Sequence, residues 1–174
     1  RIVFHVFGIE LLKDLGIADL LVFGACFTII VGSLVALVQD NLKRRLAYST
    51  ISQLSYVLLG LALLTPAAGA AGVMHIGMHA FGKITLFFCA GAIYVAAHKT
   101  EISDMRGLGR KMPFTFGAFL LASLSIIGLP PMGGSWSKWL LIMGAADTGQ
   151  WMMIAVLMIS SLLNVAYLLP LVGR

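Results

Sequence analysis

Three ionisable side chains recur every four residues in one apolar stretch: His75, His79 and Lys83. On a helix, residues four apart lie on one face, and eight residues rise about 12 Å at about 1.5 Å per residue. Histidine changes its protonation near neutral pH, and a lysine removed from water releases its proton more readily. A line of such groups, spaced for bridging water, is suited to proton transfer. The alternative is two core histidines with satisfied hydrogen bonds and a lysine that extends to a polar surface.

Two lysines are isolated from other charge. Lys83 and Lys138 are the only Asp, Glu, Lys or Arg residues within 46–98 and 112–146, respectively. An ammonium in hydrocarbon costs at least about 3 kcal/mol on insertion scales, so a fold usually keeps it for an ion path, a partner charge or a switch. We therefore predict that both lysines take part in moving charge. For Lys138 the alternative is a side chain that reaches the interface beside the aromatic Trp139.

A face of small polar residues could support this line. Ser49, Ser52 and Tyr56 recur at helical intervals in one apolar stretch. In a membrane such groups either join helices by hydrogen bonds or hold a water wire. Joining helices is the simpler interpretation of this stretch taken alone. The nearby Lys43 is interpreted first as a determinant of membrane orientation rather than as a ligand.

The composition is that of a polytopic membrane protein of the all-α class. Apolar residues make up 60% of the chain and charged residues 11%, against about a quarter in soluble domains. Several apolar runs reach about 20 residues, the length that crosses a bilayer. The net charge of +5 lies in short loops, which indicates membrane orientation rather than nucleic-acid binding. Cys26 and Cys89 lack metal-ligand spacing, so we expect no metal and no cofactor.

The elements that position the candidate residues are five predicted membrane spans, one of them broken. The segment 113–146 would be about 50 Å long as one helix, which is too long for a single pass, and two passes with a turn need about 40 residues. Pro130 and Pro131 interrupt it, so we predict a break at 129–134 just before Lys138. Broken helices are frequent in transporters. The predicted spans are 17–38, 46–64, 71–97, 113–146 and 151–172.

The loop charges predict an orientation. With one broken pass, the loops at 39–45 and 98–112 lie on the same side as the C-terminus, and that side holds eight Lys or Arg residues against two. The positive-inside rule then places these loops in the cytoplasm. Residues 1–16 are predicted to be a loop or interfacial segment, and the chain is interpreted as a segment of a larger membrane protein. The eight are Lys43, Arg44, Arg45, Lys99, Arg106, Arg110, Lys111 and Arg174, and the two are Arg1 and Lys13.

Four motifs in one order carry a family resemblance. Together they closely resemble the C-terminal half of the antiporter-like membrane subunits of respiratory complex I, membrane-bound hydrogenases and Mrp-type multisubunit cation/proton antiporters. The resemblance covers nearly the whole chain. The motifs are Lys-Arg-Arg-Leu-Ala-Tyr-Ser-Thr-Ile-Ser-Gln at 43–53, His-x3-His-Ala-x2-Lys-x2-Leu-Phe at 75–87, Met-x-Gly-Leu at 105–108 and Gly-Leu-Pro-Pro-x2-Gly-x2-Ser-Lys at 128–138.

The resemblance implies a bundle of about fourteen helices built from two inverted repeats, of which this chain supplies the second. It implies that His75, His79 and Lys83 belong to a central hydrophilic axis and that Lys138 lies near the proton exit. It also implies that Lys43 caps the helix that begins the Ala-Tyr-Ser-Thr motif. The sequence departs from the family at Asn41, where an Asp is frequent, and Lys138-Trp139 is more similar to the D-type antiporter subunit.

The predicted function is proton conduction along a Lys/His/water axis, within a cation/proton antiporter or a complex I-like NADH dehydrogenase. The expected partners are other membrane subunits, the lipid bilayer, protons and, in an antiporter, Na⁺ or another monovalent cation. A carboxylate partner for Lys83 or Lys138 would come from outside this chain. We expect a bacterial plasma-membrane protein without redox centres of its own. The alternatives are a membrane scaffold subunit and a quinone-reactive redox subunit, for which no quinone pocket is indicated.

Overall fold

The computed structural model describes residue 8 and residues 15–173, and its regular elements over this range are helices, which confirms the predicted all-α class. The loop or interfacial segment predicted at 1–16 lies almost entirely outside the described residues, as do Arg1, Lys13 and Arg174. The elements are α2 (Ile17–Val38), α3 (Leu42–Ala62), α4 (Pro66–Ala97), η2 (Ile102–Met105), α5 (Leu108–Lys111), α6 (Pro113–Ile127), α7 (Gly133–Asp147) and α8 (Trp151–Val172).

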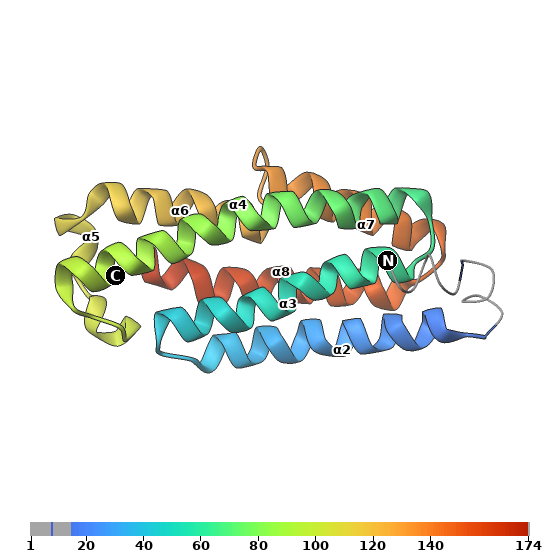
Figure 1. Cartoon of the computed structure of the whole chain (residues 1–174), viewed down its shortest axis with the longest axis horizontal. Coiled ribbons are helices and arrows are strands. Elements are labelled where there is room, and N and C mark those ends of the chain that lie inside the picture. Colours follow the sequence, from blue (N-terminus) through green and yellow to red (C-terminus); the bar gives the residue numbers. More distant parts are fainter. Residues whose placement is uncertain (1–7, 9–14, 174) are drawn as a thin grey trace.

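The long helices run side by side as an elongated bundle (Figure 1). By length and composition, α2, α4 and α8 are long and apolar enough to cross a membrane. α6 and α7 follow one another along α4, and each packs against it. α3 packs between α2 and α4, and α8 contacts α2, α6 and α7. α4 and α8 therefore hold the two halves of the interrupted segment in place.

Two of the helices begin earlier than the sequence predicted, because polar residues cap them. α3 begins at Leu42 rather than at 46, since the Asn41 side chain accepts a hydrogen bond from the Arg44 N–H at 3.1 Å. α4 begins at Pro66 rather than at 71, with Thr65 as its cap and proline in the first turn. The implied capping role of Lys43 is therefore a wrong assignment for this chain: Asn41 holds that position.

The predicted interruption in 113–146 is present as a gap between α6 and α7. Gly128 ends α6 with a φ of +89°, a left-handed conformation that glycine adopts without strain, and its N–H donates to Leu124 O at 3.0 Å. The Pro130–Pro131 peptide bond is cis. A Cβ atom on Gly134 would overlap the Ser125 carbonyl oxygen, so α7 begins against the backbone of α6.

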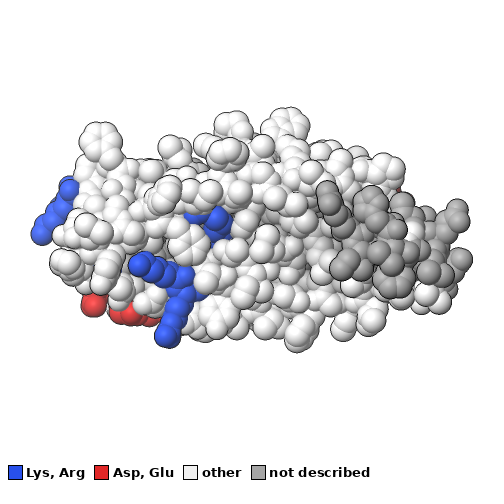
Figure 2. All heavy atoms as spheres, in the orientation of Figure 1, with Lys and Arg blue, Asp and Glu red and all other residues white. Residues whose placement is uncertain are grey.

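Hydrogen bonds join the two loops at one end of the bundle. Leu42 N donates to Thr100 O at 3.0 Å, and Ile102 N donates to Asp40 O at 2.9 Å. The Asp40 carboxylate also accepts from the Ser103 N–H at 3.1 Å and hydroxyl at 2.6 Å. The charged side chains visible in Figure 2 gather mainly toward this end, which also carries α5. The loops 39–41 and 98–112 thus share one end of the bundle.

The apolar core consists of two clusters, one toward each end of the bundle. The first cluster contains Leu46 of α3, Leu86 of α4 and Leu168 of α8. The second contains Leu59 of α3, Ala71 of α4 and Leu157 of α8. On each of these helices the sequence between the two clusters carries buried polar residues. The bundle therefore encloses a polar layer between two apolar ones.

Candidate functional site

The polar layer contains every candidate relay residue predicted on α4 and α7. Burying polar and charged groups together costs free energy unless they are hydrogen-bonded, so their concentration between the two apolar clusters requires a reason. The predicted Lys83, His75, His79 and Lys138 lie in this layer, whereas Lys43 lies outside it with its Nζ 4.9 Å from the Tyr94 ring centre. The layer consists of Ser33, Ser49, Ser52, Gln53, Ser55, His75, His79, Lys83, Ser137, Lys138, Ser160 and Asn164, whereas the buried Ser123 of α6 lies among residues of the first apolar cluster.

Lys83 points from α4 into the bundle and contacts α3. Its side chain is only 5% exposed. The Nζ donates to the Ser49 hydroxyl at 2.6 Å and to Leu46 O at 3.1 Å. The bond to Ser49 is the shorter of the two. The Lys83 ammonium therefore does not extend to a surface, and the predicted support from Ser49 is a direct contact.

His75 is held between α3 and α7. Its Nε2 lies 3.1 Å from Gln53 Oε1, and its Nδ1 lies 2.9 Å from the Ser137 hydroxyl. With the Gln53 amide in this orientation its oxygen can only accept, so Nε2 carries a hydrogen, and a neutral His75 accepts from Ser137 at Nδ1. Ser137 also lies 3.2 Å from Gly134 O. If His75 gains a proton, the Ser137 hydroxyl can turn to donate to Gly134 O, so the site accommodates both protonation states.

His79 lies between His75 and Lys83 on the same face of α4. Its ring stacks on that of His75, with centroids 6.0 Å apart and an interplanar angle of 18°. Neither His79 nitrogen has a hydrogen-bond partner among the described residues, although the side chain is only 7% exposed. Buried polar atoms of this kind are usually satisfied by water. The geometry suits an imidazole that exchanges protons with its neighbours through water.

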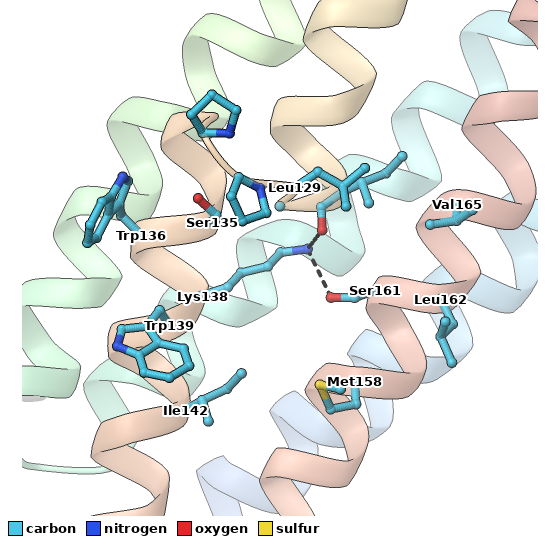
Figure 3. Close-up of a pocket in the computed structure, with 14 residues that line it drawn as sticks. Leu129, Ser135, Trp136, Lys138, Trp139, Ile142, Met158, Ser161, Leu162 and Val165 are labelled. Carbon is cyan, nitrogen blue, oxygen red and sulfur yellow. Dashed lines mark hydrogen bonds between the residues drawn. The ribbon is translucent and has the colours of Figure 1, made fainter.

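Lys138 reaches from α7 across the interruption. Its Nζ donates to Ile127 O at 2.8 Å and to the Ser161 hydroxyl of α8 at 3.1 Å (Figure 3). In a continuous helix, Ile127 O would accept from the N–H of residue 131, which is a proline and has none. Pro131 therefore leaves a carbonyl free, and the ammonium of Lys138 binds it.

A pocket of about 640 Å³ surrounds this lysine (Figure 3). It lies between the end of α6, the start of α7 and the middle of α8, and its lining is mostly apolar. Ser135, Lys138 and Ser161 are the polar side chains among the lining residues. Met158 and Leu162 line it on the α8 side. The interruption thus leaves space beside a buried ammonium.

Tyr56 joins the two parts of the site. Its ring stacks on His75, with centroids 5.3 Å apart, and the Lys138 Nζ lies 5.3 Å from the Tyr56 ring centre. Ser137, which bonds to His75, immediately precedes Lys138 on α7. His75 and Lys138, which are 63 positions apart in the sequence, are therefore neighbours through Tyr56 and α7. Hydrogen bonds and ring stacking thus link α3, α4 and α7 around one buried site.

Several participating residues were not singled out as site residues from the sequence. Ser137 and Gln53 contact His75, and Ser161 contacts Lys138; of these three, Gln53 and Ser137 lie in the motifs at 43–53 and 128–138, and Ser161 lies in none of the four motifs. Ser52, which was predicted to support the axis, binds Ile29 O at 2.9 Å and Ser33 at 2.8 Å instead. The sequence signal that could have identified them is their position: each of these serines is a small polar residue within an apolar run.

The chain resembles known membrane subunits in sequence. It is 44% identical over 139 residues, or 80% of its length, to NADH-quinone oxidoreductase subunit N of Desulforudis audaxviator. It covers 28% of that relative, so it spans less than a third of the relative's length. The subunit L protein of Rickettsia bellii is 38% identical over 69% of the chain and is covered to 18%.

Solved structures agree with the fold. A chain of the Mrp complex from Dietzia sp. DQ12-45-1b superposes with a TM-score of 0.86 at 31% identity, over 88% of this chain and 29% of that one. A chain of respiratory complex I from Thermus thermophilus superposes with a TM-score of 0.84 at 28% identity, over 89% of this chain and 33% of that one.

The comparisons agree with the expected family. Relatives from complex I and from the Mrp complex share both the sequence and the fold over most of this chain. The model of the family described as "NADH:quinone oxidoreductase/Mrp antiporter, TM" matches residues 3–164. The chain belongs to this family of integral membrane subunits.

Proposed function

We propose that this chain conducts protons across or within the membrane as part of a larger antiporter-like subunit. The observation that carries the proposal is the continuous series of buried titratable groups, Lys83, His79, His75 and Lys138, enclosed between two apolar clusters. Four such groups buried in the middle of the bundle would each cost a scaffold subunit free energy without adding to its stability.

The proposed transfer proceeds along α4 and then crosses to α7. A proton passes between Lys83 and His79, then to His75, through water at the orphaned nitrogens of His79. His75 holds the proton while Ser137 turns toward Gly134 O, and passes it on toward Lys138 beside Tyr56. Lys138 stores it beside the carbonyl left free by Pro131. Changes in charge around either lysine would gate the transfer.

The proposed setting follows from the relatives. They are subunits of NADH-quinone oxidoreductases and of an Mrp complex, so we propose that this chain works beside other membrane subunits. In an antiporter the coupling is to Na⁺ or another monovalent cation, and in a complex I relative it is to electron transfer in other subunits. We also propose a bacterial plasma membrane, with the segments 39–45 and 98–112 on the cytoplasmic side.

The test is proton-coupled transport in vesicles that carry the intact complex. Lys83→Ala should abolish transport while leaving assembly on a native gel unchanged. Lys83→Arg keeps the positive charge in a group that does not deprotonate, so it should be inactive as well. Lys111→Ala, at an exposed position on α5, is the matched control and should transport normally.

The outcomes separate proton transfer from the alternatives. Normal transport by Lys83→Ala in an assembled complex would overturn the proposal and favour the scaffold function. Full activity of Lys83→Arg would show that only the charge of Lys83 is needed and would overturn its role as a proton carrier.

A further inference from the structure

The pocket beside Lys138 combines one buried charge with an apolar wall. Its volume of about 640 Å³ is within the range of about 300–1,000 Å³ that is typical of small-molecule sites. Among the described residues that line it, Lys138 is the one with a charged side chain. The proposed proton path ends at this lysine and makes no use of the space around it.

The Lys138 ammonium can accommodate a further acceptor. An ammonium carries three N–H donors, and among the described residues the Lys138 Nζ donates to two acceptors, Ile127 O and the Ser161 hydroxyl. Both acceptors are neutral, whereas buried charges in proteins are usually paired. The sequence has no Asp or Glu within 112–146 or 151–172. The described part of the chain therefore provides the cation of an ion pair but not the anion.

The pocket opens between α7 and α8, on an apolar side of the bundle. Trp136 and Trp139 of α7 and Met158 and Leu162 of α8 line it, and all four side chains are exposed. Lys138 lies between these two pairs, with its Nζ directed toward α8 (Figure 3). A ligand that enters here can lie along apolar side chains and reach the ammonium with one end.

These features select a ligand with an apolar chain and a carboxylate at its end. A terminal carboxylate is slender, so it can reach an ammonium that is itself buried. The phosphate of a membrane phospholipid lies between the glycerol and the headgroup, and both are too bulky to follow it. The Ser161 hydroxyl accepts from Lys138 and has its own hydrogen to donate to the second carboxylate oxygen. Hydrogen bonds between charged groups are about twice as strong as neutral ones.

We propose that this pocket binds a long-chain fatty acid, with the carboxylate on Lys138 and Ser161 and the chain between α7 and α8. A carboxylate beside the ammonium stabilises its protonated form, so bound fatty acid keeps the proton on Lys138. Occupancy therefore slows the last step of the proposed transfer. The binding site stands on the pocket and the lysine, whereas the effect on transport rests on the proposed function.

The test of binding uses a photoactivatable fatty acid at a subsaturating concentration, in vesicles that carry the intact complex. Labelling should map to α7 and α8 beside the pocket. Lys138→Ala should reduce it at least about tenfold, because a hydrogen bond to a charged group is worth at least that factor in affinity. The methyl ester of the same probe keeps the chain without the charge and should show the same loss, which carries the test if Lys138→Ala does not assemble. Labelling elsewhere, or equal labelling by acid and ester, would overturn the proposal.

A pair of substitutions on α8 tests the effect on transport. Leu162→Trp adds bulk inside the pocket, whereas Ile159→Trp adds it at an exposed position outside the pocket lining. Both should conduct protons normally without fatty acid, because neither residue belongs to the proposed path. Half-inhibition should need at least about tenfold more oleate in Leu162→Trp than in Ile159→Trp. Oleate also carries protons through lipid by itself, and this leak is common to both variants.

The results distinguish this inference from the proposed function. Equal inhibition of Leu162→Trp and Ile159→Trp would overturn the effect of the pocket on transport. Failure of the proposed function would appear instead as normal transport by Lys83→Ala, and it would leave the labelling of the pocket unchanged.

Discussion

At Gly134 the two halves of the broken helix are in close contact, and we predict that Gly134→Ala disrupts the site. The added methyl group would overlap the Ser125 carbonyl oxygen, which belongs to the backbone of α6 and cannot turn away as a side chain would. Overpacking of this kind costs about 1–3 kcal/mol, and a backbone contact belongs at about the upper end of that range. The greater helix propensity of alanine offsets up to about 1 kcal/mol of this loss in stability.

The expected net loss is therefore about 2 kcal/mol, or about a 30-fold shift of the unfolding equilibrium. Gly117→Ala is a matched control on α6, because a methyl group at Gly117 has no atom within 4 Å. It carries the same change in propensity without the overlap, so the two variants should differ by about 3 kcal/mol.

The assay is denaturation of the full-length protein by SDS in mixed micelles, followed by tryptophan fluorescence, with transport measured in parallel. Trp136 and Trp139 lie on α7 and report on its separation from α6. Transport should fall with stability, because the hydrogen bond from Lys138 to Ile127 O crosses the interruption. Equal stability of Gly134→Ala and Gly117→Ala would refute the close contact between α6 and α7.

Two further substitutions test individual contacts. Ser137→Ala removes the partner of His75 Nδ1 and should lower proton transport severalfold, with a loss of about 1 kcal/mol in stability. The control is Ser135→Ala, which should transport normally, because the Ser135 hydroxyl donates to Met132 O at the start of its own helix. Equal transport by the two would contradict the role of Ser137. Asn41→Ala should lower the free energy of thermal unfolding by about 1 kcal/mol, because α3 loses its cap. Asn41→Asp restores a capping oxygen and should recover that loss. If it does not, the effect of Asn41→Ala comes from the lost hydrogen bond to Glu101 rather than from the cap.

The local features of the site could be predicted from the sequence. The spacing of His75, His79 and Lys83 places them on one face of any helix. In the structure this face of α4 is buried in the interior of the bundle. Pro130 and Pro131 predict an interruption because proline has no backbone N–H and its ring clashes with the preceding helical turn. These inferences hold because helical geometry and proline sterics act over a few residues and do not depend on the partner helix.

The contacts between distant segments could not be predicted in the same way. The hydrogen bond of Ser137 to His75 joins positions 62 apart and depends on how α4 and α7 are packed. Ser52 faces Ser33 rather than Lys83 because the rotation of α3 is set by its approach to Gly32 of α2, where a Cβ would lie 3.2 Å from the Ser52 backbone. A polar residue in an apolar run indicates depth, but its partner is decided by the packing of whole helices.

The course of α4 gives the proposed transfer a dependence on voltage. His75 and Lys83 are eight residues apart on one continuous helix, so a charge that passes between them moves about 12 Å along the helix axis. For a helix near the membrane normal, a displacement of about 12 Å crosses about 0.4 of a hydrocarbon core of about 30 Å, and therefore about 0.4 of the membrane potential. The free energy of moving one charge through that fraction is about 0.9 kcal/mol per 100 mV, which changes the distribution of the proton between the two ends about fivefold. Energisation of the membrane would then bias which end of α4 holds the proton.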